Sequence, residues 1–342
     1  MVLKQIKGMR RKFTDPAIPA LLLALALAGC QREPVPAAGD VIRFSVSAVN
    51  IAPALSKADP AIPASNTIER PGNPLAQPDC QLKVWASLNT GAGWKKVFND
   101  PSIVLENESG NWTYNGDKYW NREANYRFMA LYPVDADVQS ASGDVDQIKV
   151  NYTDNTQDLM VAATQLRGKG ATAVDLAFLH TCSAVRIFFV DPDRGTQDVR
   201  YKITNLEIQG LYMAGTLTNN QLTFTWAPSG NRTSGYSWPE TPGSSWNVPA
   251  SYTAFTPWLF FIPQTLTDNS ALSFTYEVNM GDGGTQLLPA TLPINRYNNS
   301  DIVWESGKMY TYYIKIRPKA IEMTVEWTDW DTDGNDDTLT IE

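Results

Sequence analysis

The sequence contains little histidine and little cysteine, which limits the chemistry that it can support. Among 342 residues there are one histidine, His180, and three cysteines, Cys30, Cys80 and Cys182. A structural zinc site takes about four nitrogen or sulfur ligands, so this supply argues against zinc. A catalytic pair needs facing side chains and an orienting acid, and His180, Cys182 and Ser183 lie too close along an extended chain to provide that dependably. We therefore expect no enzyme activity, no metal and no cofactor.

Basic residues are scarce beyond the N-terminus. The whole chain has 28 Lys and Arg against 36 Asp and Glu, a net charge of −8. Without residues 1–29 the numbers are 23 and 35, a net charge near −12. Such an acidic surface does not attract phosphate backbones, which argues against nucleic acid as a partner.

The chain has one long apolar run, residues 17–28, and this run is too short to span a bilayer as a stable helix. It ends in Leu27-Ala28-Gly29-Cys30, which resembles the lipobox of bacterial lipoproteins. The alternative, a buried core helix, is disfavoured by the basic residues before the run and the proline-rich tract after it. We predict a signal peptide over 1–29, lipid on Cys30 and a tether over 30–40, which would anchor the protein in the outer membrane at the cell surface.

No stretch of ten or more residues has the periodicity of an amphipathic helix, whereas short strand-like stretches recur. The 22 prolines, 11 tryptophans and 14 tyrosines fit strands joined by turns. A first strand is predicted over Val41–Val49, an irregular segment over 51–78 and a long loop over 227–257. The other predicted strands are 82–88, 103–105, 111–114, 126–132, 158–163, 174–179, 184–190, 201–209, 212–217, 221–226, 258–263, 271–279, 309–317 and 321–327.

This pattern predicts an all-β fold with two β-sandwiches in series. The sequence DPDRG at 191–195 is typical of a turn and of a domain boundary. We therefore expect an N-terminal β-sandwich domain over 41–192 and a C-terminal β-sandwich domain over 193–342.

Several short motifs follow the lipobox in order. They are Ile42-Arg43-Phe44, Lys118-Tyr119-Trp120, YRFMALYP (126–133), QDLMVA (157–162), LAFLHTCSAV (176–185), FIPQ (261–264), WESGKMY (304–310) and Trp327. Together they resemble the fimbrillin-like family of Bacteroidales surface lipoproteins. The resemblance implies two tandem transthyretin-like domains and a role as a fimbrial (pilus) subunit or adhesin without enzyme activity.

In that family an Arg-specific protease removes the first strand, and a strand donated by another subunit fills the groove by β-augmentation. Here the removable strand would be Val41–Val49, and Arg70 is the candidate cleavage site. Pro71 follows it, and trypsin-like cleavage before proline is poor. This departure favours a subunit that keeps its lipid, as an anchor, minor or tip component. The C-terminal stretches 321–327 and 338–341 are donor candidates, although they could instead close the protein's own sheet.

The stretch 226–258 carries several aromatic residues among serine, glycine and asparagine. Trp238 and Trp246 are candidates for contacting a glycan, because exposed aromatic rings stack on sugars; the alternative is that these rings cover the core. A glycan-binding lipoprotein of a polysaccharide-uptake system is therefore the alternative function. With either function, the protein would bind a glycan or protein receptor on a host or bacterial surface.

Two further features allow two interpretations each. Cys80 and Cys182 could form a disulfide in an oxidising compartment, or they could be separate buried thiols. Asp329, Asp331 and Asp333 partly match a calcium loop, but Thr340 replaces the glutamate expected at its twelfth position. An acidic turn is therefore the favoured interpretation of that segment.

Overall fold

The computed structural model describes most of the chain from Val41 onward. The described residues are 41–48, 71–98, 101–139, 145, 148–168, 173–196, 199–233, 235–239, 243–279, 284–297, 299–318, 320–329 and 340–341. Within these ranges there is no α-helix, and the only helical element of any length is the 3₁₀ turn η1 (Pro74–Ala76). No helix in this part of the chain is long and apolar enough to cross a membrane. The prediction of an all-β fold is confirmed.

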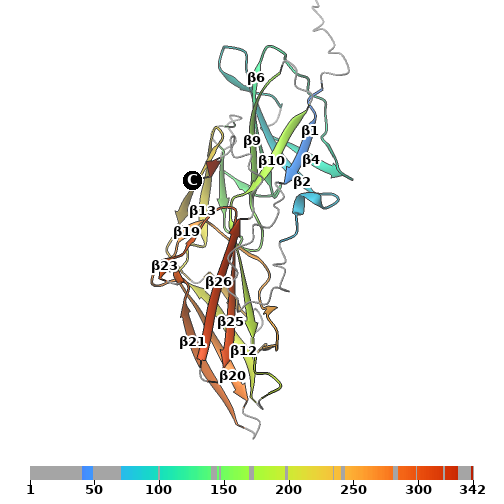
Figure 1. Ribbon diagram of the computed structural model, residues 1–342. Coiled ribbons are helices and arrows are strands. Elements are labelled where there is room, and N and C mark those ends of the chain that lie inside the picture. Colours follow the sequence, from blue (N-terminus) through green and yellow to red (C-terminus); the bar gives the residue numbers. More distant parts are fainter. Residues whose placement is uncertain are drawn as a thin grey trace, which may run out of the picture. The chain divides into compact units, whose positions relative to one another are not determined.

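Eight strands form the largest sheet, in which β6 is the middle strand of the order and β1 lies at one edge (Figure 1). All its pairings are antiparallel except that of β1 with β10. In spatial order the strands are β1 (Phe44–Ala48), β10 (Val174–His180), β9 (Met160–Arg167), β6 (Asn125–Tyr132), β2 (Gln81–Asn89), β4 (Ile103–Glu108) and β5 (Asn111–Thr113), with β3 (Trp94–Lys96) beside β2.

Two five-stranded sheets share the C-terminal core. The first has the order β17 (Thr253–Ala254), β11 (Ser183–Val190), β25 (Lys308–Arg317) and β26 (Ala320–Asp329), with β18 (Leu259–Phe261) beside β11. The second has the order β15 (Tyr236–Trp238), β12 (Arg200–Gln209), β20 (Ala271–Asn279) and β21 (Thr285–Pro293), with β16 (Trp246–Asn247) beside β12. Apolar residues that alternate along β11, β25, β12 and β20 form one buried cluster between these two sheets.

A further five-stranded sheet combines distant parts of the sequence. Its order is β27 (Thr340–Ile341), β14 (Thr223–Ser229), β13 (Ala214–Asn220), β8 (Lys149–Tyr152) and β7 (Asp137–Val138). Two small ladders complete the fold: β19 (Gln264–Thr265) with β24 (Val303–Trp304), and β22 (Arg296–Tyr297) with β23 (Ser300–Asp301).

Most predicted strands are confirmed, with boundaries shifted by a few residues. The predicted loop over 227–257 is partly wrong, because β15, β16 and β17 lie within it and pair with β12 and β11. Strands β8 and β21 were not predicted. The C-terminal stretch 321–327 closes the protein's own sheet as β26, through ten antiparallel pairs with β25.

Two strands that lie before the predicted domain boundary at 192/193 pair with strands after it. Strand β11 pairs in parallel with β25 and antiparallel with β17 and β18, and β8 pairs with β13. Residues 41–342 form one compact unit by their contacts. The division into two domains at this boundary stays a prediction.

Candidate functional site

Strand β1 occupies an edge position that separates it from the strands next to it in sequence. It pairs in parallel with β10, so that Phe44 lies beside Val174, Val46 beside Leu176 and Ala48 beside Phe178 (Figure 1). Along residues 42–48, apolar residues that are buried or half-buried alternate with polar residues that are exposed. Ile42 is fully buried and Phe44 is 7% exposed, whereas Arg43, Ser45 and Ser47 are exposed. Ile42 and Phe44 therefore belong to the buried cluster that also contains Leu176 of β10 and residues of η1 and β2.

The opposite side of β1 contacts the segment that follows β5. The backbone N–H of Ile42 donates to the carbonyl of Lys118 at 2.7 Å, and Val41 forms an antiparallel bridge with Tyr119. On the other edge, the N–H of Val174 donates to the carbonyl of Arg43 at 2.8 Å. The start of β1 is thus held by backbone hydrogen bonds on both sides, as an inserted strand is.

Tyr114 links the backbone of β1 to this segment. Its hydroxyl donates to the carbonyl of Ile42 at 2.9 Å and accepts the N–H of Lys118 at 3.2 Å. Burial raises the pKa of Tyr114 above its ordinary value of 10, so its hydroxyl remains a donor at alkaline as well as neutral pH. Because this bond goes to a carbonyl, it does not depend on the side chains of the strand that it holds.

The Phe44 ring lies in an aromatic pocket. Its centroid is 5.7 Å from that of Tyr114 and 5.9 Å from that of Phe128, both in edge-to-face geometry. Trp120 continues the pocket, with its ring 6.0 Å from Phe128. Edge-to-face pairs add about 0.5–1.5 kcal/mol each beyond area burial, so Phe44 is the principal side-chain anchor of β1.

Ser45, on the exposed face of β1, makes specific polar contacts with β10. The Ser45 hydroxyl lies 3.2 Å from a carboxylate oxygen of Asp175 and 3.4 Å from the carbonyl of Val174. A hydroxyl can donate to that carboxylate, whereas an acidic side chain in its place would face a like charge.

The residues predicted for lipidation and cleavage, Cys30 and Arg70, lie outside the described residues, as do 49–69 between β1 and Arg70. Lipid on Cys30 and cleavage at Arg70 stay predictions. The calcium-like acidic segment also lies outside them, apart from the backbone of Asp329 and of Thr340. In the part of the chain that the structure describes, no three His, Cys, Asp or Glu side chains are grouped to hold a metal.

The two tryptophans predicted to contact a glycan are half-buried beside the C-terminal core. The rings of Trp238 and Trp246 lie 4.8 and 5.1 Å from that of Phe255, both edge-on. They come from β15 and β16, which both pair with β12. The structure therefore brings these two residues to one place and packs them on a shared ring. Their contact with a glycan stays a prediction.

The single histidine is buried at the end of β10. His180 Nδ1 contacts the carboxylate of Asp158, whose side chain is also buried. The sequence alone did not indicate Asp158 as the partner of His180. Asp158 lies 22 residues earlier, and only the pairing of β9 with β10 brings the two side chains together. Cys182, two residues further along the chain, is fully buried. Its burial is the main cause, and the nearby charge of Asp158 the second cause, of a pKa raised to about 12. A thiol held in its neutral form is a poor nucleophile.

The two cysteines after Cys30 are separate thiols, so the disulfide interpretation is wrong. Cys80 and Cys182 are both free and buried. Cys80 belongs to the apolar cluster inside the eight-stranded sheet, and Cys182 belongs to a different cluster. Each acts as a small core residue.

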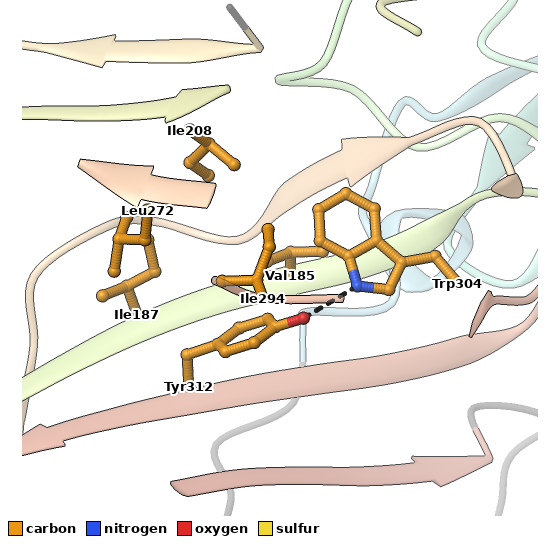
Figure 2. Close-up of a pocket in the computed structure, with 7 residues that line it drawn as sticks. All are labelled: Val185, Ile187, Ile208, Leu272, Ile294, Trp304 and Tyr312. Carbon is orange, nitrogen blue, oxygen red and sulfur yellow. Dashed lines mark hydrogen bonds between the residues drawn. The ribbon is translucent and has the colours of Figure 1, made fainter. Parts of the chain in front are cut away.

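An apolar cavity lies between the two C-terminal sheets (Figure 2). Its lining includes Ile187 and Val185 from β11 and Tyr312 from β25, together with Ile208, Leu272, Ile294 and Trp304. The Trp304 indole N–H donates to the Tyr312 hydroxyl at 3.0 Å, so the two polar groups at the cavity satisfy each other. A space of about 10 Å³ holds at most one water molecule, which makes it a packing defect and not a ligand site.

The fold and this site define an all-β protein in which β1, the first of the described strands, lies at the edge of a sheet and contributes side chains to its core. The sequence model of one family, described as fimbrillin-like, matches residues 76–330. The chain belongs to the fimbrillin-like family, which confirms the resemblance.

Solved structures share the fold at low sequence identity. A fimbrial protein from Bacteroides vulgatus aligns with a TM-score of 0.60 and 15% identity, over 85% of this chain and 99% of that chain. A candidate cell adhesion protein from Bacteroides ovatus aligns with a TM-score of 0.52 and 17% identity, over 87% of this chain and 100% of that chain. No curated protein matches the chain.

Proposed function

We propose that this protein is a non-enzymatic fimbrial subunit that is exported as a lipoprotein to the cell surface and assembles by strand exchange. The exchange takes place at the position of β1 between β10 and residues 118–119, which we call the β1 groove. The observation that carries the proposal is the placement of β1, which covers a buried core at a sheet edge but pairs with a strand 130 residues away in sequence. Removal of β1 would leave the edge of β10 unpaired and Leu176 and Phe178 uncovered, and another strand could satisfy both. Membership of the fimbrillin-like family supports this reading.

The sequence around Arg70 supports a place at one end of a fimbria. While β1 stays in its groove, no other strand can enter there. Pro71 slows cleavage after Arg70, so this subunit keeps β1 and the lipid on Cys30 for longer than a subunit with a free cleavage site. Such a subunit serves as an anchor, minor or tip component.

A pair of single substitutions tests the proposal in cells. Pro71→Ala is expected to increase cleavage after Arg70 and to shift the subunit into SDS-resistant ladders of surface protein, while Arg70→Ala is expected to abolish cleavage. Intact mass spectrometry of surface protein gives the N-terminus, and gel blots without boiling give the ladders. If neither variant changes the mass and the subunit never appears in a ladder, the assembly role is wrong. An intact lipidated monomer that binds polysaccharide would instead support the glycan-binding alternative.

A further inference from the structure

The β1 groove holds one aromatic side chain of the bound strand, that of Phe44, in a pocket of other aromatic rings. We infer that its natural partner is an extended segment of another subunit with alternating apolar residues, an aromatic residue at the Phe44 position and no acidic residue at the Ser45 position. This inference rests on the strand exchange proposed above and names the chemistry of the incoming strand.

Some contacts to β1 do not depend on the side chains of the bound strand. Three hydrogen bonds to the start of β1 go through its backbone: Ile42 to Lys118, Arg43 to Val174, and Ile42 to the Tyr114 hydroxyl. Any extended segment offers the same N–H and C=O groups. These contacts therefore hold a strand in place without reading its sequence.

Selectivity for the sequence of the strand comes from its buried side chains. Along the apolar face of β1, Ile42 and Phe44 are buried, while Val46 and Ala48 are only half-buried. Of the two buried side chains, Phe44 contacts two aromatic rings, those of Tyr114 and Phe128. A smaller side chain at this position would leave a cavity between rings that the surrounding sheet holds in place. The pocket therefore favours a ring.

The exposed rim of the groove adds a second preference. Ser45 is the exposed β1 residue whose hydroxyl reaches Asp175 of β10, at 3.2 Å. A carboxylate there would lie opposite the carboxylate of Asp175, which disfavours acidic strands. The neighbouring Arg43 is exposed, so its side chain contributes little to selection.

The experiment uses the full chain with a specific protease site inserted within residues 51–68. The chain is folded first and then cleaved, so that β1 stays bound only by its non-covalent contacts. Labelled peptides with the sequence of residues 41–48 (VIRFSVSA) then compete with the bound β1 fragment, and mass spectrometry of the gel-filtered protein measures the exchange. The peptides tested are the native sequence, Phe44→Ala, Phe44→Tyr, Ser45→Asp and, as a matched control on the exposed face, Arg43→Ala.

We expect the native and Arg43→Ala peptides to bind within about threefold of each other. The Phe44→Tyr peptide keeps the ring but adds a hydroxyl to the pocket, so it should bind more weakly than the native peptide and more tightly than Phe44→Ala. The Phe44→Ala peptide should bind at least about 100-fold more weakly, and Ser45→Asp about threefold more weakly. In a Tyr114→Phe protein, all peptides should weaken by a common factor while their ranking stays the same. That result would separate the backbone contact of the hydroxyl from the selective pocket.

The outcomes distinguish the two claims. If the native peptide exchanges but Phe44→Ala binds equally well, strand exchange stands and the aromatic selectivity is wrong. If Ser45→Asp binds as well as the native peptide, the part assigned to Asp175 is wrong. If no peptide displaces the β1 fragment at any concentration, strand exchange at this groove is itself wrong.

Discussion

At the scale of single residues, one buried hydrogen bond joins two side chains on either side of a turn. The indole N–H of Trp304 and the hydroxyl of Tyr312 are both buried and bond to each other at the wall of the apolar cavity (Figure 2). The cavity offers the indole no other acceptor among its lining side chains. The bond therefore satisfies two groups that would otherwise be unpaired.

The Tyr312→Phe substitution tests this bond. It leaves the Trp304 indole without its acceptor, and we expect the free energy of unfolding to fall by about 1–3 kcal/mol. Urea unfolding followed by tryptophan fluorescence measures the change. The matched control is Tyr212→Phe, at a half-buried ring beside Arg232, which should change stability by less than about 0.5 kcal/mol. Equal stability of the Tyr312→Phe protein and the native protein would contradict the assignment.

The two buried thiols give a prediction about pH. Burial raises the pKa of Cys80, and it raises that of Cys182 from 9.0 to about 12. Since the thiolate is the reactive form, both should resist iodoacetamide in the folded protein near pH 8 and react only when guanidinium unfolds it. The unfolded chain ionises first, so the stability that the neutral Cys182 thiol contributes is complete below pH 9 and is lost as the pH rises toward 12.

Mass spectrometry of the alkylated protein counts the modified thiols. Rapid labelling of Cys182 in the folded protein near pH 8, at the rate of an unstructured cysteine peptide, would show that the burial assigned to it is wrong. A mass lower by two hydrogens before alkylation would show a disulfide between Cys80 and Cys182.

At the scale of elements, the outer strand β21 of one C-terminal sheet carries prolines at its exposed edge. Strand β21 lies at a sheet edge and contains Pro289 and Pro293, which pair in register with Thr275 and Ala271 of β20. A proline cannot donate to a further strand, and edge strands use proline to prevent unwanted pairing. The exposed Leu287 on the same strand makes this protection more important.

Replacement of both prolines by valine therefore should promote association through β21. We expect the Pro289→Val/Pro293→Val protein to form dimers or larger species that light scattering detects at concentrations where the native protein is uniform. Pro257→Val, at an exposed position in a connection, is the control. If the double variant is no more associated than the control, the prolines do not protect this edge.

How far the sequence predicts these elements depends on whether the signal is local. Strands β2 and β20 alternate strongly and were predicted to within a residue or two, whereas the prolines of β21 hid that strand. The short strands β15 and β16 exist because β12 offers them an edge, and no local pattern encodes that partner. The same holds at the groove: the sequence predicted β1, but not its parallel pairing with β10 or the bond from Tyr114.

At the scale of the whole molecule, the sequence predicts a domain boundary at 192/193, but the strand pairing crosses it. Strand β11 lies before this point and pairs with β25, and its residues Val185, Ile187 and Phe189 belong to the C-terminal core. Strand β8 also lies before it, yet it pairs with β13. A cut at 192/193 would remove a strand from one sheet and divide another.

We therefore predict that neither residues 41–192 nor residues 193–342 fold when produced alone, and that residues 41–342 unfold in one cooperative transition. The C-terminal piece would lack β11, which leaves β25 unpaired on one edge and its tyrosines uncovered, a loss that no local rearrangement repairs. Calorimetry on the long fragment, with circular dichroism and hydrogen exchange on the two short ones, measures this. A second C-terminal piece that starts at residue 183 and so keeps β11 is the matched control, and it should recover more protected amides than the piece that starts at 193. Independent folding of both short pieces, with two separate transitions in the long one, would instead establish two autonomous domains divided at 192/193.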